Sequence, residues 1–150
     1  MMDALYTQRI LQLAADISHI GHLPSPQAKA EVVSRLCGSR VGVELCFETG
    51  GNTGGNTGVV SEFAQIVSAC ALGQVSCAIV AQHIIGSGAD ELRQVSAQMR
   101  VMLKEGGTPP SGEKWQDLKV LAPVHDYPNR HASTLLIFDA IETCLQQLGH

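Results

Sequence analysis

The chain has 150 residues and a mass of 15.9 kDa, which fits one domain over residues 1–150 and leaves no room for two large ones. Its 10 basic residues against 14 acidic ones give a net charge of −4, and aromatic residues are only 4%, so a nucleic-acid partner is disfavoured. Hydrophobic residues make up 45% of the chain, which excludes wholesale disorder.

The first part of the chain is predicted to be a helix followed by three strands. Asp3 is the predicted N-cap of a helix whose apolar residues recur at helical spacing as far as Ile17, and Gly21 and Pro24 end it. The repeat GGNTGGNTG over 50–58 is predicted to be a long hairpin loop, because it lacks the Lys and the strand-to-helix context of a phosphate-binding loop. The predicted strands span Ala28–Arg35, Arg40–Glu48 and Val59–Ser68.

The second part of the chain is predicted to be helical. No charged residue occurs from Ala64 to Ala89, but polar residues and glycines interrupt this run, so we expect a buried strand leading into a buried helix and no membrane span. The whole order predicts an α+β fold, in which a three-stranded antiparallel sheet packs with an N-terminal helix and several C-terminal helices. The predicted helices of this part span Cys70–Ile85, a segment capped by Asp90, Trp115–Leu121 and Arg130–Leu148.

The cysteine count and the first residues of the chain indicate whether the protein is expected in a reducing or an oxidising cellular compartment. Five cysteines are an odd number for a disulfide framework, and the opening MMDALYTQRI lacks the basic region and apolar run of a secretory signal. We therefore expect reduced thiols in a cytoplasmic or organelle-matrix protein. The cysteines are Cys37, Cys46, Cys70, Cys77 and Cys144.

Four short stretches match a known family in order and spacing. With them the chain resembles the U-type iron–sulfur cluster scaffolds, the IscU/NifU/SufU family, over most of its length. The resemblance implies a single IscU/NifU N-terminal-like domain, with a three-stranded sheet packed against helices. The stretches are LYTQRIL (5–11), LCGSRV (36–41), ACALGQVS (69–76) and YPNRHASTLL (127–136).

The resemblance also implies a site of three cysteines and one aspartate at one end of the sheet. The first family cysteine stands in a Cys-Gly-Asp motif and matches Cys37, whereas the aspartate position holds Ser39. The second follows the third strand and matches Cys70. The third comes shortly after a Pro-x-Arg motif ending at Arg130, and its position holds Ser133. Two of the three cysteines are therefore present, and both other ligand positions are serine.

Cys37 and Cys70 are the predicted ligands of a metal or cluster, because thiolates are soft ligands that bind zinc, iron and iron–sulfur clusters. A helix N-terminus favours thiolate at Cys70, while an inert turn cysteine is the alternative for Cys37. Zinc needs four ligands, and His131 is a candidate third, with a histidine hydrogen-bonded to its neighbours as the alternative. Ser133 is a cofactor-binding candidate or a first-turn capping hydroxyl. Arg130 is a candidate to hold a persulfide or carboxylate, or is an exposed arginine.

The leading functional hypothesis is a scaffold-like protein of iron–sulfur cluster assembly that binds iron, zinc or a cluster through a depleted cysteine site. By resemblance, its partners are a cysteine desulfurase and acceptor apo-proteins, and it acts by coordination and sulfur transfer, not as an enzyme. One alternative is a pseudo-scaffold, a structural or regulatory subunit of a larger complex without metal chemistry. Another is a zinc-bound sulfur acceptor. The cysteines outside the site are expected to be packing residues: Cys46, Cys77 and Cys144.

Overall fold

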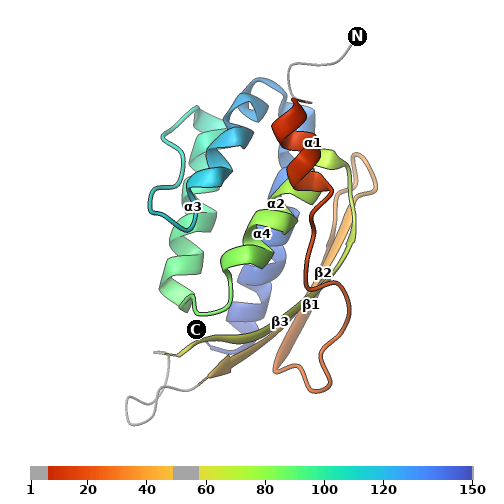
Figure 1. Cartoon of the computed structure of the whole chain (residues 1–150), viewed down its shortest axis with the longest axis vertical. Coiled ribbons are helices and arrows are strands. Elements are labelled where there is room, and N and C mark those ends of the chain that lie inside the picture. Colours follow the sequence, from red (N-terminus) through yellow and green to blue (C-terminus); the bar gives the residue numbers. More distant parts are fainter. Residues whose placement is uncertain (1–6, 49–57, 150) are drawn as a thin grey trace.

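A small antiparallel sheet and a set of helices make up the computed structural model, which describes residues 7–48 and 58–149 (Figure 1). Sheet and helices form separate layers, so the predicted α+β class is confirmed. The elements are, in chain order, α1 (Gln8–Ala14), β1 (Ala28–Val33), β2 (Arg40–Glu48), β3 (Val59–Ser68), α2 (Ala71–His83), α3 (Ala89–Glu105), the 3-10 helices η2 (Gln116–Asp126) and η3 (Pro128–Arg130), and α4 (His131–Gln147).

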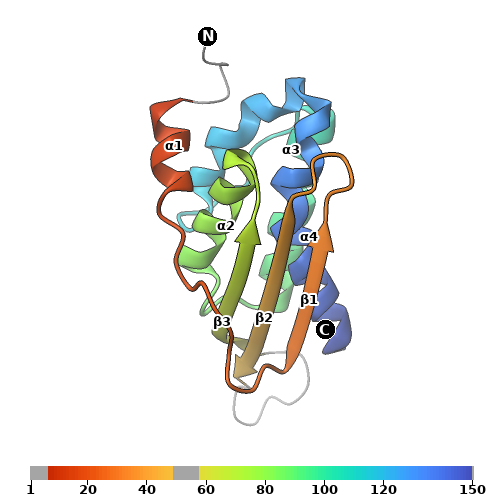
Figure 2. The same ribbon diagram turned by 90° about the vertical axis from the view of Figure 1, so that its right-hand side faces the viewer.

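The sheet has the strand order β1-β2-β3, with both pairs antiparallel. The alternation predicted for the central strand is observed: Val41, Val43 and Leu45 face the helices and are at most 1% exposed. Outside β3, the segment after α1 runs along the strand (Figure 2), and Ile20 pairs with Gln65 in parallel. The sheet is thus extended at that edge by the chain's own N-terminal part.

The described helices cover one face of the sheet and leave the other face open (Figures 1 and 2). α4 packs on β1 and β2, while α2 and α3 pack on α4, and α1 packs on α2. Arg100 on α3 joins two helices, because its guanidinium contacts the carboxylates of Asp139 and Glu142 on α4. The open edge of β1 is covered at Lys29, whose N–H and C=O both bond to the Gln147 side-chain amide.

The first helix is shorter than predicted at its C-terminal end. α1 ends at Ala14 and not at Ile17, because the following residues lie along β3, where the His19 carbonyl accepts the Gln65 N–H at 2.9 Å. A segment that donates and accepts across a sheet edge must be extended. Thr7 caps α1 through its hydroxyl, and the predicted cap Asp3 lies outside the described residues.

Further boundaries differ from the predictions, among them the end of β1, which lies at Val33 and not at Arg35. Gly88, not Asp90, is the N-cap of α3, and Asp90 lies in the first turn, where its charge suits the positive end of the helix dipole. The short helix predicted over Trp115–Leu121 is the longer 3-10 helix η2, which contains Pro123, a residue without an N–H to donate. Except for its last residue, the glycine-rich loop predicted over 50–58 lies outside the described residues.

Within residues 7–48 and 58–149, no helix is both long and apolar enough to cross a bilayer. The charge-free run divides as predicted into the end of β3 and the buried helix α2.

Candidate functional site

The turn between β1 and β2 lies at one end of the sheet (Figure 2), and it contains Cys37. The turn is closed by two backbone hydrogen bonds of 2.8 Å, from the Ser34 N–H to the Ser39 carbonyl and from the Gly38 N–H to the Ser34 carbonyl. Gly38 has φ of 75°, a left-handed conformation that residues with a side chain rarely adopt. This sharp reversal leaves the Cys37 side chain exposed.

Cys70 is the N-cap residue of α2, where β3 ends and the chain turns into the helix layer. Its Sγ lies 3.3 Å from the Oγ of Ser133 on the first turn of α4. Its backbone N–H donates to the Oγ of Ser39 at 3.4 Å. Cys70 is partly exposed, whereas Ser133 is buried. The start of α2 therefore meets the start of α4 and the β1–β2 turn at one point.

Ser39 connects the two cysteines. The Cys37 Sγ lies 3.1 Å from the Ser39 Oγ, and that same Oγ accepts the Cys70 N–H. The structure thus gathers all four positions that the family resemblance designates as ligands. We call this group of two thiols and two hydroxyls, Cys37, Ser39, Cys70 and Ser133, the thiol site.

The surroundings of Cys37 favour its thiolate. Its pKa lies below the ordinary 9.0, mainly because the Ser34 hydroxyl, 3.5 Å away, and the Ser39 hydroxyl stabilise the charged sulfur by hydrogen bonding. A smaller contribution comes from the positive charge of Arg130, which precedes α4. Sequence reasoning overlooked Ser34. Ser34 stands three residues before Cys37 in the turn that contains Gly38, and this spacing could have indicated that its hydroxyl contacts the thiol.

His131 is directed away from solvent. It is 5% exposed, and its Nε2 lies 2.9 Å from the Val124 carbonyl and 3.1 Å from the His125 carbonyl. These contacts match the alternative to a metal ligand, a histidine that hydrogen-bonds to its neighbours. Among the residues that the structure describes, no three or more His, Cys, Asp or Glu side chains are grouped to hold a metal ion. The structure therefore does not gather Cys37, Cys70 and His131 into one such group.

Ser133 does not cap α4, contrary to the capping alternative. Its hydroxyl donates to the Arg130 carbonyl at 3.2 Å and contacts the Cys70 sulfur, and α4 has no side-chain cap. The Ser133 hydroxyl thus bonds backwards to a carbonyl of its own first turn and also lies against the site.

The remaining cysteines are packing residues, as expected. Cys77 and Cys144 are 0% exposed, and burial raises the pKa of each thiol to about 12. Burial also raises the pKa of Cys46, whose Sγ lies 3.3 Å from the Ser25 carbonyl.

These buried thiols predict alkaline instability. Above pH 9 the thiols of the unfolded chain ionise, while those of Cys77 and Cys144 keep their protons up to pH of about 12. The folded state then binds more protons, so each thiol lowers the free energy of unfolding by about 1.4 kcal/mol per pH unit in this window. Urea unfolding at pH 8 to 11 under reducing conditions measures this slope. If Cys77→Ala shows the same decrease of the free energy of unfolding with pH as the wild type, the buried thiol of Cys77 does not cause it.

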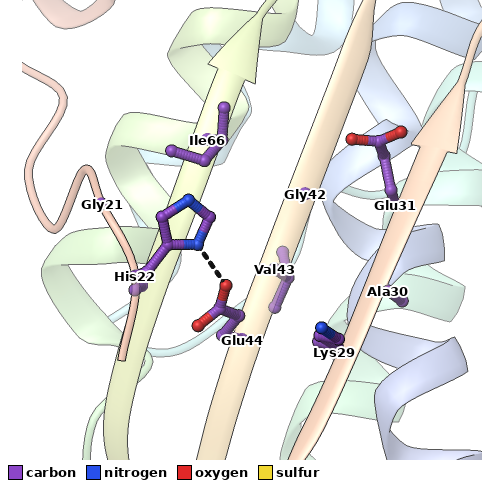
Figure 3. A pocket seen from close by; sticks show the side chains of 10 residues that line it. Gly21, His22, Lys29, Ala30, Glu31, Gly42, Val43, Glu44 and Ile66 are labelled. Atoms are coloured by element: carbon purple, nitrogen blue, oxygen red, sulfur yellow. Dashed lines mark hydrogen bonds and ion pairs between the residues drawn. The ribbon is translucent and has the colours of Figure 1, made fainter. Parts of the chain in front are cut away.

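A separate hollow of about 590 Å³ lies on the open face of the sheet (Figure 3). It exists because Gly42 on the central strand has no side chain between Glu31 and Ile66. At its rim the His22 Nδ1 lies 2.5 Å from a carboxylate oxygen of Glu44, and this bond lowers the pKa of Glu44. The hollow contains neither site cysteine.

Solved structures resemble the chain over nearly its whole length. A nitrogen-fixing NifU-like protein (N-terminal) from Brucella abortus is 46% identical, with a TM-score of 0.89, covering 97% of this chain and 94% of that one. A hypothetical protein is 17% identical, with a TM-score of 0.77, covering 97% of this chain and 99% of that one.

A third solved structure is a candidate iron–sulfur cluster assembly scaffold protein for the SUF system from thermophilic Fervidobacterium islandicum AW-1. It is 19% identical, with a TM-score of 0.75, covering 94% of this chain and 96% of that one. The two likenesses under 20% identity bear on the fold alone. No protein-family model and no curated protein matches the chain.

Proposed function

Since this chain belongs to the U-type iron–sulfur cluster scaffold family, we propose that it serves in iron–sulfur cluster assembly by holding a cluster at Cys37 and Cys70. The observation that carries the proposal is the contact of one hydroxyl, that of Ser39, with the Cys37 sulfur and the Cys70 N–H. The two thiols are 33 residues apart in sequence, and this shared hydroxyl links them at the same end of the sheet. The cluster is cargo, received and passed on.

The donor set supports binding through sulfur and not through the serines. Thiolates are soft ligands for iron and for clusters, whereas a serine hydroxyl keeps its proton near neutral pH. Ser39 and Ser133 instead place their hydroxyls against the ligand sulfurs, at 3.1 Å from the Cys37 Sγ and 3.3 Å from the Cys70 Sγ, where they would serve as outer-shell partners of the ligands. We infer that the site binds a cluster less firmly than the three-cysteine site of the family, a property that suits release. Arg130 would add positive charge beside the anionic cluster. A metal role for His131 stays a prediction.

The partners follow from the family: a cysteine desulfurase that supplies sulfur and acceptor apo-proteins that receive the cluster. The exposed Cys37, preceded by Leu36 with 75% of its surface exposed, offers such partners an accessible thiol. The chain itself would turn over no small substrate. A cytoplasmic or organelle-matrix location stays a prediction.

The pseudo-scaffold is the second candidate. It is favoured by one observation, that the described residues contain no group of three or more His, Cys, Asp or Glu side chains fit to hold a metal ion. In that case the fold would serve as a structural or regulatory subunit, and neither site cysteine would matter for assembly with its partner.

Incubation with a preformed [2Fe–2S] cluster under anaerobic conditions separates the two candidates. We expect visible charge-transfer absorption and bound iron after gel filtration, and a loss of at least about tenfold in bound iron for Cys37→Ser and for Cys70→Ser. Cys46→Ser is the matched control, because it removes a buried thiol outside the site and should bind iron like the wild type. Wild-type protein that retains no iron would reject the proposal in favour of the pseudo-scaffold.

A further inference from the structure

The outer side of β1 is an edge of the sheet, because β1 pairs only with β2. Backbone groups of an edge strand alternate between the paired strand and the outside. Lys29 directs its N–H and C=O outward, to the Gln147 side chain, whereas Ser34 donates its N–H inward, to the carbonyl that precedes β2. By this alternation Glu31 and Val33 also face outward. Within the part of the chain that the structure describes, neither makes a hydrogen bond on that side.

We propose that this edge of β1 is a docking surface for a second copy of the chain, and that Gln147 keeps it closed. Two β1 strands would pair antiparallel about a twofold axis at Ala30, which brings Lys29 of each copy opposite Glu31 of the other. The sheets of the two copies would then be continuous. The thiol site takes no part in this contact, so the proposed function does not depend on it.

The charges of this edge are complementary to those of a second copy. Lys29 and Glu31 are two residues apart on β1, and both side chains lie on the open face of the sheet (Figure 3). In the proposed register an ammonium lies opposite a carboxylate at two places, and opposite charges across a strand pair are favourable. A shifted register that paired Glu31 with Glu31 of the other copy would bring like charges together. The charges therefore select both the partner and the register.

Neither charge is held firmly within the single chain. The ion pairs of the described residues do not include Lys29. Glu31 has one ion pair, between its Oε1 and the Arg40 Nε at 3.7 Å, and both side chains are more than half exposed. Exposed ion pairs contribute little to stability. Both charges are therefore available to a second copy.

Gln147, the last residue of α4, occupies the backbone groups that the contact needs. Its Nε2 donates to the Lys29 carbonyl at 2.8 Å, and its Oε1 accepts the Lys29 N–H at 3.2 Å. In the proposed register Glu31 of the second copy would make these two bonds. Because the amide offers the same donor and acceptor as a residue of a neighbouring strand, Gln147 and the second copy compete. The wild type should therefore stay a single chain at concentrations at which an uncapped chain pairs.

Sedimentation equilibrium of Gln147→Ala over a range of concentrations tests the inference. We expect a dimer dissociation constant at least about tenfold below that of the wild type, because neither copy must first break two hydrogen bonds. The mass should rise from 15.9 kDa to about twice this value. Gln146→Ala, at the adjacent exposed position of α4, is the matched control and should sediment like the wild type. If Gln147→Ala stays at 15.9 kDa at every concentration, the inference is overturned and the edge is left for a strand of a different protein.

Charge variants of Gln147→Ala test the register. Lys29→Glu would place carboxylates opposite each other, so the dimer should dissociate at least about ten times more readily. Adding Glu31→Lys exchanges the two charges and should restore the dimer. A dimer that persists in Lys29→Glu, or that the exchange does not restore, would contradict the proposed pairing. Urea unfolding of each variant checks its fold.

Amide hydrogen exchange gives a second measurement of the same contact. The Glu31 N–H faces outward in the single chain and would be bonded to Lys29 of the other copy in the dimer. Its exchange in Gln147→Ala should therefore slow by at least about tenfold as the concentration rises into the range of the dimer. A dimer in which this amide exchanges as fast as in the single chain would show that the copies meet elsewhere.

Discussion

At pH 7, iodoacetamide is expected to alkylate Cys37 at least about a thousand times faster than Cys77, because only the thiolate reacts. A thiol with the ordinary pKa of 9.0 is about 1% ionised at this pH, and the lowered pKa of Cys37 places it above that level. Burial raises the pKa of Cys77 to about 12, so about one such thiol in 100,000 is ionised. Burial also shields its sulfur from the reagent. Peptide mapping by mass spectrometry over a time course gives both rates.

The serine variants test the cause of this selectivity. Ser34→Ala removes the largest contribution to the lowered pKa of Cys37, so the alkylation rate should reach its midpoint at a higher pH. Ser111→Ala, in the loop before η2, is the matched control and should leave the profile unchanged. In denaturant Cys37 and Cys77 should react alike. Similar rates in the folded protein would show that the turn does not activate Cys37.

Gly73→Ala is expected to destabilise the protein and to weaken cluster binding together. A Cβ at this position would lie 2.9 Å from the Ser133 carbonyl oxygen and 3.0 Å from the Ala69 Cβ. The first of these atoms belongs to the α4 backbone, so the added methyl group must push α2 and α4 apart. Such overpacking costs about 1–3 kcal/mol. The same displacement separates Cys70 from Ser133, whose side chains are 3.3 Å apart. Urea unfolding and bound iron measure the two effects.

Gly42→Ala is the matched control for this substitution. The nearest atoms to a Cβ at Gly42 are 3.9–4.0 Å away, in the hollow on the open face of the sheet. No contact is tighter than ordinary van der Waals distance, and the unfolded chain loses freedom, so a gain of about 0.4–1 kcal/mol is expected. If Gly73→Ala unfolds at the same urea concentration as the wild type, the close contact between α2 at Gly73 and α4 at Ser133 does not fix the positions of Cys70 and Ser133.

Local pattern predicted most of the secondary structure. Alternation along Arg40–Glu48 identified the central strand and its buried face, because residues two apart in a strand share a side. Predictions at helix ends were poorer. The end of α1 depends on the pairing of the next segment with Gln65, 45 residues later than Ile20, and no local pattern contains that information.

The amino-acid order alone was enough to identify the family, the strand and helix layers, and Cys37 and Cys70 as the reactive candidates, since these depend on residue type and short-range spacing. The folded arrangement decided the rest. The contacts of Ser39 with Cys37 and Cys70, the approach of Ser133 across 63 residues, and the inward direction of His131 all depend on where α2 and α4 begin relative to the β1–β2 turn. Hydrogen-bond partners are set by distances of a few ångströms, and packing between distant segments determines those distances.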